Sequence, residues 1–324
     1  MRNIRTDLAQ ETYSFLLETA DSVPGIASEE ETGQHISITR VKITTDSAAE
    51  KIGKPKGNYI TLFLPDIRYV DKKIYEEMYD SISKELRLLL PQGRRDKPIL
   101  IIGLGNRGIT SDSLGPAVLD RLMITRHLFS YAPDALSSGM HSVCAIAPGV
   151  LGITGIETEE IISALCQKID PYAVICIDAL AARGIDRITA TVQICDTGIH
   201  PGAGVGNNRK EISENTLGIP VIAIGVPTVV DAATITDDTL DIVIKNLKNS
   251  VDPNSSFFQM LQNLDDDAKH ELIHTAVSNS LPHFMTTPKD IDILIAKSAE
   301  IVANGINFAL HDGITMEDIQ MYVS

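Results

Sequence analysis

The stretch ILIIGLGNRGITSDSLGP, residues 99–116, joins an apolar run to a glycine-containing loop and then to the start of a helix. Residues 99–102 are all apolar, which is typical of a strand that is buried on both faces of a parallel sheet. In the loop that follows, Ser111 or Asp112 is placed to cap a helix that begins within 113–116. The stretch therefore predicts a strand, a flexible loop and a helix, as in an α/β fold.

The glycines of this loop match the G-x-G-x-x-G fingerprint of dinucleotide-binding sites, but their surroundings do not. The fingerprint requires a helix that opens at the third glycine and an acid about 20 residues later, at the end of the next strand. Here the helix opens several residues after Gly108, and the next apolar stretch, 142–149, ends in Pro-Gly without an acid. We therefore favour a loop that delivers Asp112 to a helix start over nucleotide binding at Gly103–Gly108.

Apolar stretches and helical patterns alternate along the chain in a way that predicts an α/β fold with a mainly parallel sheet flanked by helices. An N-terminal antiparallel pair is expected at 35–45 and 58–64, separated by the turn sequence GKPKGN, and a helix at 72–90. A C-terminal helical extension is expected at about 255–324. Further strands are expected at 98–103, 142–147, 172–178, 188–196 and 219–225, with helices at 113–129, 158–169 and near 229–247.

The composition argues against several classes of protein. The net charge of −15 argues against nucleic-acid binding, because neutralising phosphates requires clustered Lys and Arg. The first residues contain no apolar signal segment and no run of about 18 apolar residues follows, so we expect a cytoplasmic chain without a membrane partner. The 4 cysteines form no C-x-x-C pair and are expected to be buried free thiols, with no metal and no cofactor.

Two acids are expected at the same edge of the sheet. Asp112 follows the strand at 98–103, and Asp178 closes the apolar stretch at 172–177. Considered singly, Asp112 is explained as a helix cap and Asp178 as a residue that faces solvent. Their shared position favours a site instead, because ligands of open α/β sheets bind at the carboxyl ends of the strands. Two neighbouring carboxyls share a proton, so that the ionised one can deprotonate a water while the protonated one polarises a carbonyl. This pair therefore predicts peptide hydrolysis without a metal or a covalent intermediate.

A D-T-G triplet at 196–198 matches the active-site triplet of pepsin-like and retroviral proteases. Those enzymes supply the triplet twice in an all-β fold, whereas this chain carries it once, after an α/β pattern. We interpret it as a turn, with Asp196 as a candidate to line the cleft. The glycine-rich segment 198–211 is a candidate substrate-side loop, and its His200 is expected to hydrogen-bond within the loop or line the cleft rather than act as a general base.

Four blocks of the sequence resemble the germination protease family of endospore-forming bacteria. The resemblance implies an atypical aspartic endopeptidase that degrades small acid-soluble spore proteins, with Asp112 and Asp178 as its two essential aspartates. It also implies a zymogen that forms a homotetramer and removes its own propeptide, located in the forespore or spore core. The blocks are GLGNRGITSDSLGP (103–116), APGVLGITGIET (147–158), the segment 177–213 and LGIPVIAIGVPTVVDA (217–232), and the likeness extends more loosely over the whole chain.

The family's cleavage preference is an acidic residue, then a large apolar residue, then alanine. The triplet Asp7-Leu8-Ala9 fits this preference, so the resemblance implies cleavage between Asp7 and Leu8. The implied products are a propeptide, 1–7, and a single peptidase domain, 8–324, with a core at about 95–250 and a helical part at about 255–324.

The block at 103–116 also resembles, more distantly, the hydrogenase maturation proteases, which share the α/β architecture and read nickel with carboxylates at the related positions. A metal-recognising maturation protease, with Asp112 and Asp178 as ligands, is therefore an alternative. A non-catalytic binding protein that uses the same cleft is a second alternative.

Overall fold

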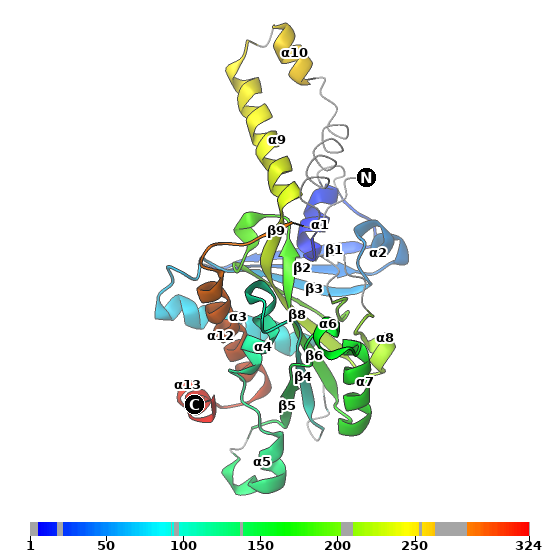
Figure 1. Ribbon diagram of the computed structural model, residues 1–324, viewed down its shortest axis with the longest axis vertical. Coiled ribbons are helices and arrows are strands. Elements are labelled where there is room, and N and C mark those ends of the chain that lie inside the picture. The colour runs from blue at the N-terminus through cyan, green and yellow to red at the C-terminus, as the bar shows by residue number, and fades with distance from the viewer. Residues whose placement is uncertain are drawn as a thin grey trace.

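One continuous sheet forms the centre of the computed structural model, with helices on both of its faces (Figure 1). The strand order is β1-β2-β3-β7-β8-β6-β4-β5, and β9 pairs with β8. The predicted α/β class, with a parallel core, an N-terminal antiparallel part and a C-terminal helical part, is confirmed. The structure describes residues 6–17, 22–91, 93, 97–136, 139–201, 210–252, 255–262 and 284–323.

Four strands form the parallel core of the sheet: β4 (Ile99–Gly103), β5 (Val143–Ile146), β6 (Ala173–Ala182) and β8 (Val221–Asp231). Alternate residues of β4 pack in different hydrophobic clusters. Ile101 lies in the cluster on one face of the sheet and Ile102 in the cluster on the other face. Burial on both faces is the physical reason for the unbroken apolar run at 99–102.

The other strands extend this core in antiparallel fashion: β1 (Ile26–Thr32), β2 (Ser37–Ile43), β3 (Gly57–Phe63), β7 (Thr191–Cys195) and β9 (Met285–Thr286). The predicted pairing of 35–45 with 58–64 is confirmed by β2 and β3. The edge strand β1 was not predicted, since its sequence IASEEET is polar and largely exposed. Its partner β2 supplies the pairing that its own sequence pattern does not indicate.

A turn alone between β2 and β3 was a wrong expectation. The connection contains the helix α2 (Asp46–Ile52), which is capped at both ends. The Thr45 side chain accepts a hydrogen bond from Ala48 N, and Gly53 ends the helix with a φ of 68°. The cap signals are local, but Ala48 and Ile52 are buried against the sheet, so packing completes the helix.

Helices cover the sheet on both faces. On one face, α3 (Lys72–Leu89), α4 (Leu114–Leu119) and α12 (Ile291–Leu310) share a core with the strands. On the other face, α7 (Thr158–Ile169) and α8 (Glu214–Leu217) pack on the parallel strands, while α1 (Ala9–Leu17) and α2 pack on the antiparallel ones. The remaining helices are η1 (Thr110–Asp112), α5 (Arg126–Tyr131), η2 (Pro133–Ala135), α6 (Leu151–Thr154), η3 (Ile185–Arg187), α9 (Ala232–Ser250), α10 (Ser256–Gln262) and α13 (Met316–Val323).

The single helix predicted over 113–129 is wrong, because the chain forms α4 and α5 with an irregular connection between them. Tertiary hydrogen bonds interrupt the helix: Met123 N donates to the side chain of Asn307 at 2.9 Å, and Thr125 N donates to the Val143 carbonyl at 3.1 Å. The helical C-terminal part is confirmed for α10, α12 and α13, while residues 263–283 of the predicted extension lie outside the described residues.

Helix α12 is, among the described residues, the one helix long and apolar enough to cross a membrane. The most apolar window of this helix is 72% buried inside the molecule. It packs against α3 and α4, with Leu294 and Val302 fully buried (0% exposed). Burial in the core accounts for its apolar composition.

All four cysteines are free thiols, as expected from their spacing. Cys166, Cys176 and Cys195 are buried, and Cys144 is half-buried. Burial raises the pKa of the Cys166 thiol to about 11, so this side chain is protonated at neutral pH and behaves as a small apolar group.

We expect Gly305→Ala in α12 to destabilise the fold, although alanine is the better helix former by about 1 kcal/mol. A Cβ at Gly305 would lie 2.5 Å from Cγ2 and 2.8 Å from Cβ of Ile82 in α3, so the two helices would have to separate. Overpacking of this kind costs about 1–3 kcal/mol. Urea unfolding measures the effect, with Gly152→Ala, whose new Cβ meets nothing within 4 Å, as the matched control. A midpoint for Gly305→Ala at or above that of the control would contradict the close helix contact.

Candidate active site

The glycines of the loop after β4 allow Asp112 to lie close to that strand. Gly105 has a φ of +105°, and a Cβ there would lie 2.1 Å from the carbonyl oxygen of Asp112. A Cβ at Gly103 would lie 2.6 Å from the carbonyl oxygen of Gly115 in α4. Glycine tolerates the positive φ at Gly105 and the close backbone contacts at both positions, where a Cβ would collide. Close packing of the loop against η1 and α4 therefore accounts for the first two glycines of the G-x-G-x-x-G match.

Asp112 is held in place by hydrogen bonds from its own loop. Its Oδ2 and its carbonyl oxygen each accept from Asn106 N at 2.9 Å, and Thr228 in β8 donates to the Ser111 carbonyl at 2.6 Å. The expectation that Ser111 or Asp112 caps the helix is wrong, because both lie in η1 and Ser113 occupies the cap position of α4. The Asp112 carboxyl is therefore not used as a helix cap.

Asp178 lies where β6 passes beyond the end of its neighbour β4. Ile177 is the last residue of β6 that pairs with β4, and its carbonyl accepts from Leu104 N at 2.8 Å. Asp178 follows directly, opposite Gly225 of β8, and is only 7% exposed. The pairing of β4 with β6 thus places Asp178 beside the loop that carries Asp112.

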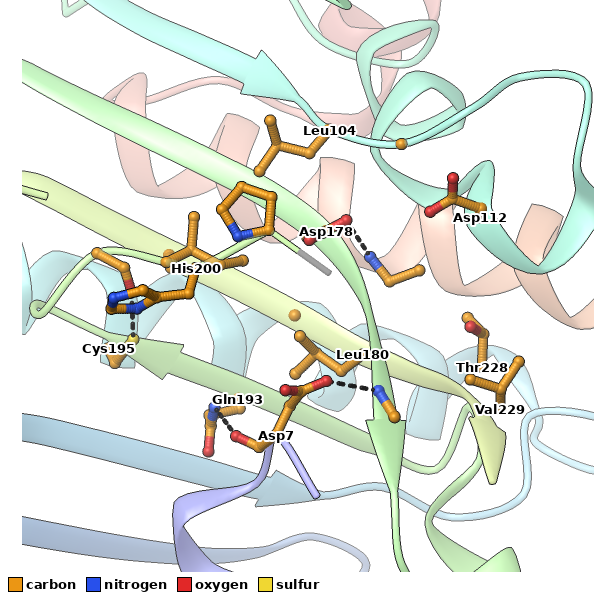
Figure 2. A pocket seen from close by; sticks show the side chains of 18 of the residues that line it. Asp7, Leu104, Asp112, Asp178, Leu180, Gln193, Cys195, His200, Thr228 and Val229 are labelled. Carbon is orange, nitrogen blue, oxygen red and sulfur yellow. Dashed lines mark hydrogen bonds between the residues drawn. The ribbon is translucent and has the colours of Figure 1, made fainter. Parts of the chain in front are cut away.

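One cavity of about 330 Å³ is lined by Asp112, Asp178 and Asp7 (Figure 2). In Figure 2 the Asp178 carboxyl lies between those of Asp112 and Asp7. The cavity walls come from the ends of β6, β7 and β8 and from the loops after β4 and β5. The two acids that the strand pattern placed at one edge of the sheet therefore open into the same space.

The electrostatics of this cavity favour a neutral Asp178. Burial raises the pKa of Asp178 well above its ordinary value, and the negative charges of Asp112 and Asp7 raise it further. A hydrogen bond from Ala179 N, at 2.9 Å, acts in the opposite direction because it stabilises the carboxylate. Burial is the largest of these effects, so Asp178 keeps a proton at pH values where an exposed aspartate has lost it.

Asp7 lies in this cavity and pairs with β6, and helix α1 begins two residues after it. Asp7 N donates to the Ala181 carbonyl at 2.9 Å, and Ala181 N donates to the Asp7 carboxylate at 2.8 Å. Leu8 and Ala9 follow and are fully buried (0% exposed). Main-chain pairing with a strand combined with buried side chains is a common way to hold an extended peptide. Residues 1–5 lie outside the described residues.

Two further side chains reach this segment. Lys54 Nζ donates to the carbonyl oxygen of Asp7 at 2.9 Å, and Gln193 Nε2 donates to the same oxygen at 3.2 Å. Gln193 Oε1 also accepts from Ala9 N at 2.7 Å. Gln193 could have been noticed as the one amide in the apolar strand TVQIC, whereas Lys54, in a turn sequence, carries no comparable signal.

Asp196 and His200 differ in their relation to the cavity. His200 lines it, and its Nε2 lies 3.7 Å from the Glu211 carboxylate. The Asp196 carboxylate accepts from Asn58 N at 2.8 Å and from Asn58 Nδ2 at 2.5 Å, which ties the end of β7 to β3. Asp196 is not among the described residues that line the cavity. Of the candidate substrate-side loop 198–211, residues 202–209 lie outside the described residues.

Within the described ranges, no group of three or more His, Cys, Asp or Glu side chains is placed to hold a metal ion. Protein sites for zinc use three or four such ligands. Asp112 and Asp178 therefore offer a metal ion fewer protein ligands than such sites use.

The sequence model of the germination protease family matches residues 4–256 and 249–323. The chain belongs to the germination protease family. It is 44% identical to the germination protease of Clostridium acetobutylicum over 327 residues, which covers 100% of both chains. It is 45% identical to that of Clostridium tetani (99% and 100% covered) and 41% identical to that of Priestia megaterium (99% and 97% covered). Membership of the germination protease family makes the chain a peptidase.

We expect Asp178→Asn to stabilise this germination protease family member at neutral pH. Folding raises the pKa of Asp178, so the folded state binds its proton more tightly, and stability falls as the pH rises from the ordinary aspartate value through the raised one. The neutral amide of asparagine removes this loss of stability. In a chain of this length, a gain of about 1 kcal/mol would raise the Tm at pH 7 by about 1–2 °C. Thermal unfolding at pH 4 and pH 7 tests this, with the exposed Asp134→Asn as control. An unchanged pH dependence in Asp178→Asn would contradict the buried, protonated state.

Gly105→Ala is expected to leave a folded chain with little peptidase activity. The added Cβ would collide with the Asp112 carbonyl and would require φ of +105° from an L-residue, so Asp112 must move. A displacement of about 1 Å can cost about 10²-fold in rate where the displaced group takes part in the reaction, which is the role proposed for Asp112 below. Gly108→Ala is the control in the same loop, because its Cβ would meet only the Asn106 side chain, at 3.3 Å. Peptidase assays with circular dichroism measure both, and equal activity of the two variants would argue against the packing role of Gly105.

Proposed function

We propose that this peptidase is an aspartic endopeptidase that degrades small acid-soluble spore proteins during germination. We further propose that it is made as a zymogen and cleaves its own chain between Asp7 and Leu8. Asp112 and Asp178 are the proposed catalytic pair. One observation carries the proposal: Asp7, the first residue of the triplet Asp7-Leu8-Ala9, lines the same cavity as both aspartates, and Leu8 and Ala9 directly after it are buried.

The proposed roles of the two aspartates follow from their surroundings. Asp178 is buried and its pKa is raised, so it is the member that holds the proton and polarises the carbonyl of the bond to be cleaved. Asp112 is half-buried, can be reached by water, and is the proposed general base. Asp112 takes a proton from water as the water oxygen bonds to the carbonyl carbon. It then passes that proton to the leaving nitrogen as the C–N bond breaks.

The way Asp7 is held supports a preference for an acid before the cleaved bond. Its carboxylate accepts a hydrogen bond from Ala181 N, and its own N–H donates to the Ala181 carbonyl. One residue of β6 therefore binds both the main chain and the side chain of Asp7. The following Leu8 is fully buried, and so is Ala9. Buried space of this kind favours an apolar residue followed by a small one. Protein substrates with the same pattern are proposed to bind in the same way.

The proposed setting and assembly also come from the family. We propose that the enzyme acts as a homotetramer in the forespore and spore core. Helix α9 supports an assembly contact, because it projects from the body of the molecule (Figure 1) and carries the exposed apolar side chains of Ile242 and Val243. Light scattering of the purified full chain measures this assembly.

Asp112→Asn and Asp178→Asn are each expected to abolish proteolysis while leaving a folded chain. Loss of a general acid or base costs about 10²–10⁴-fold in rate. The purified chain is incubated with an extract of small acid-soluble spore proteins, and cut sites are identified by mass spectrometry. Intact mass after mild acidification reports the loss of residues 1–7. The control is Asp134→Asn, an exposed aspartate far along the chain from the site.

The outcomes separate the proposed function from its alternatives. Cleavage of the spore proteins after Glu or Asp by the control, but not by either dyad variant, supports the proposal. Normal turnover by Asp112→Asn or Asp178→Asn would remove that residue from the mechanism. Loss of activity with excess chelator would favour the metal-recognising maturation protease, and tight binding of spore proteins without cleavage would favour a binding protein.

A further inference from the structure

Two side chains that are not part of the aspartate pair contact the bond proposed for self-cleavage. Lys54 Nζ and Gln193 Nε2 both donate to the carbonyl oxygen of Asp7, at 2.9 Å and 3.2 Å. This oxygen belongs to the peptide bond between Asp7 and Leu8. Two donors that converge on one carbonyl oxygen form the arrangement that stabilises negative charge when a nucleophile adds to the carbonyl carbon.

We propose that Lys54 and Gln193 form the oxyanion-binding site of this peptidase. They bind the carbonyl oxygen of the cleaved bond in the chain's own N-terminus and in protein substrates that occupy the same place. The proposal rests on the function proposed above and adds two catalytic residues to the aspartate pair.

Gln193 is held rigidly enough for this role. It lies in β7, which is paired on one side with β3 and on the other with β8, and it is only 7% exposed. Its amide spans the bond, since Nε2 donates to the Asp7 carbonyl and Oε1 accepts from Ala9 N at 2.7 Å (Figure 2). A donor fixed before the reaction needs no reorganisation when charge develops on the oxygen.

Lys54 supplies positive charge at the same oxygen. It follows Gly53, the αL residue that ends α2, and Lys54 N donates to the Ala49 carbonyl at 3.2 Å. Its main chain is therefore anchored to the helix end while its side chain lines the cavity. A hydrogen bond from an ammonium group strengthens as the acceptor gains negative charge, so Lys54 binds the transition state more tightly than the resting peptide.

The two donors fit the hydrolysis without changing its balance of atoms. When the water oxygen bonds to the Asp7 carbon and its proton moves to Asp112, the carbonyl oxygen takes up negative charge. Lys54 and Gln193 donate to that oxygen, and the mechanism proposed above adds the proton of Asp178. The charge returns to a carbonyl as the bond to the Leu8 nitrogen breaks and that nitrogen receives the proton from Asp112. Lys54 and Gln193 end the cycle unchanged.

The test is the first-order rate at which the purified full chain loses residues 1–7, followed by intact mass. Lys54→Met keeps most of the length of the side chain and removes its charge and donors. Gln193→Glu keeps the acceptor for Ala9 N but places a carboxylate oxygen where Nε2 donated. Each is expected to slow trimming by about 10²–10³-fold, the usual cost of losing one such donor. Lys54→Arg, which keeps a cation, is expected to lose much less.

A pH profile separates catalysis from a structural role. A protonated Glu in Gln193→Glu regains a donor, so its trimming rate relative to the wild-type chain should recover as the pH falls toward the ordinary carboxyl pKa of about 4.3. Asp112→Asn should show no such recovery. The matched controls are Lys51→Met and Gln167→Glu, both at exposed helix positions. Both are expected to trim at the wild-type rate.

The outcomes distinguish this inference from the proposed function. If the wild-type chain is trimmed and Asp112→Asn is not, but Lys54→Met and Gln193→Glu match their controls, the oxyanion site is wrong and the aspartate mechanism stands. If both donor variants are slow without any recovery of Gln193→Glu at low pH, the two side chains only position the peptide, and the inference is overturned. If the wild-type chain is never trimmed, or Asp112→Asn is trimmed normally, both proposals fail.

Discussion

The parallel pairing of β4 with β6 is the constraint on which the rest of the site depends. β4 ends at Gly103, whereas β6 continues to Ala182. The hydrogen bond from Leu104 N to the Ile177 carbonyl is the last one between the two segments before they separate. Beyond that point β6 pairs only with β8, and the loop after β4 leaves the cavity that Asp178 lines. Because side chains alternate between the two faces of a strand, a slip of one residue would turn Asp178 to the opposite face.

A carboxyl group at such a position is costly to bury in its charged form. The neighbouring charges of Asp112 and Asp7 increase that cost, and the raised pKa of Asp178 is the response. Lys54 brings the compensating positive charge to the same cavity, but to the main chain of the bound segment rather than to a carboxylate. The cavity is thus lined by a buried acid with a raised pKa, a second acid and a cation that contacts the Asp7 carbonyl.

The pattern of apolar and polar residues predicted those helices and strands that keep one pattern of burial along their whole length. The strands β2, β3 and β4 and the helices α3 and α7 follow from periodicity, because each shows one residue pattern over its whole length. The errors arose where tertiary contacts override the local pattern. The edge strand β1 is polar and depends on β2 for its pairing. The helix expected over 113–129 is broken by hydrogen bonds to Asn307 and Val143, which come from distant parts of the chain.

For the site, the sequence alone determined the family, one acid at the end of an apolar run, a second acid in the loop after another, and the acid, large apolar, alanine triplet at 7–9. These features are short and contiguous, and each can be read in one stretch. Only the tertiary structure decided that Asp7 lines the cavity together with both acids, that Gln193 and Lys54 reach the Asp7 carbonyl, and that Asp196 binds Asn58 instead. The physical reason is that these contacts join residues far apart in the chain, from strands whose order in the sheet no local pattern reveals.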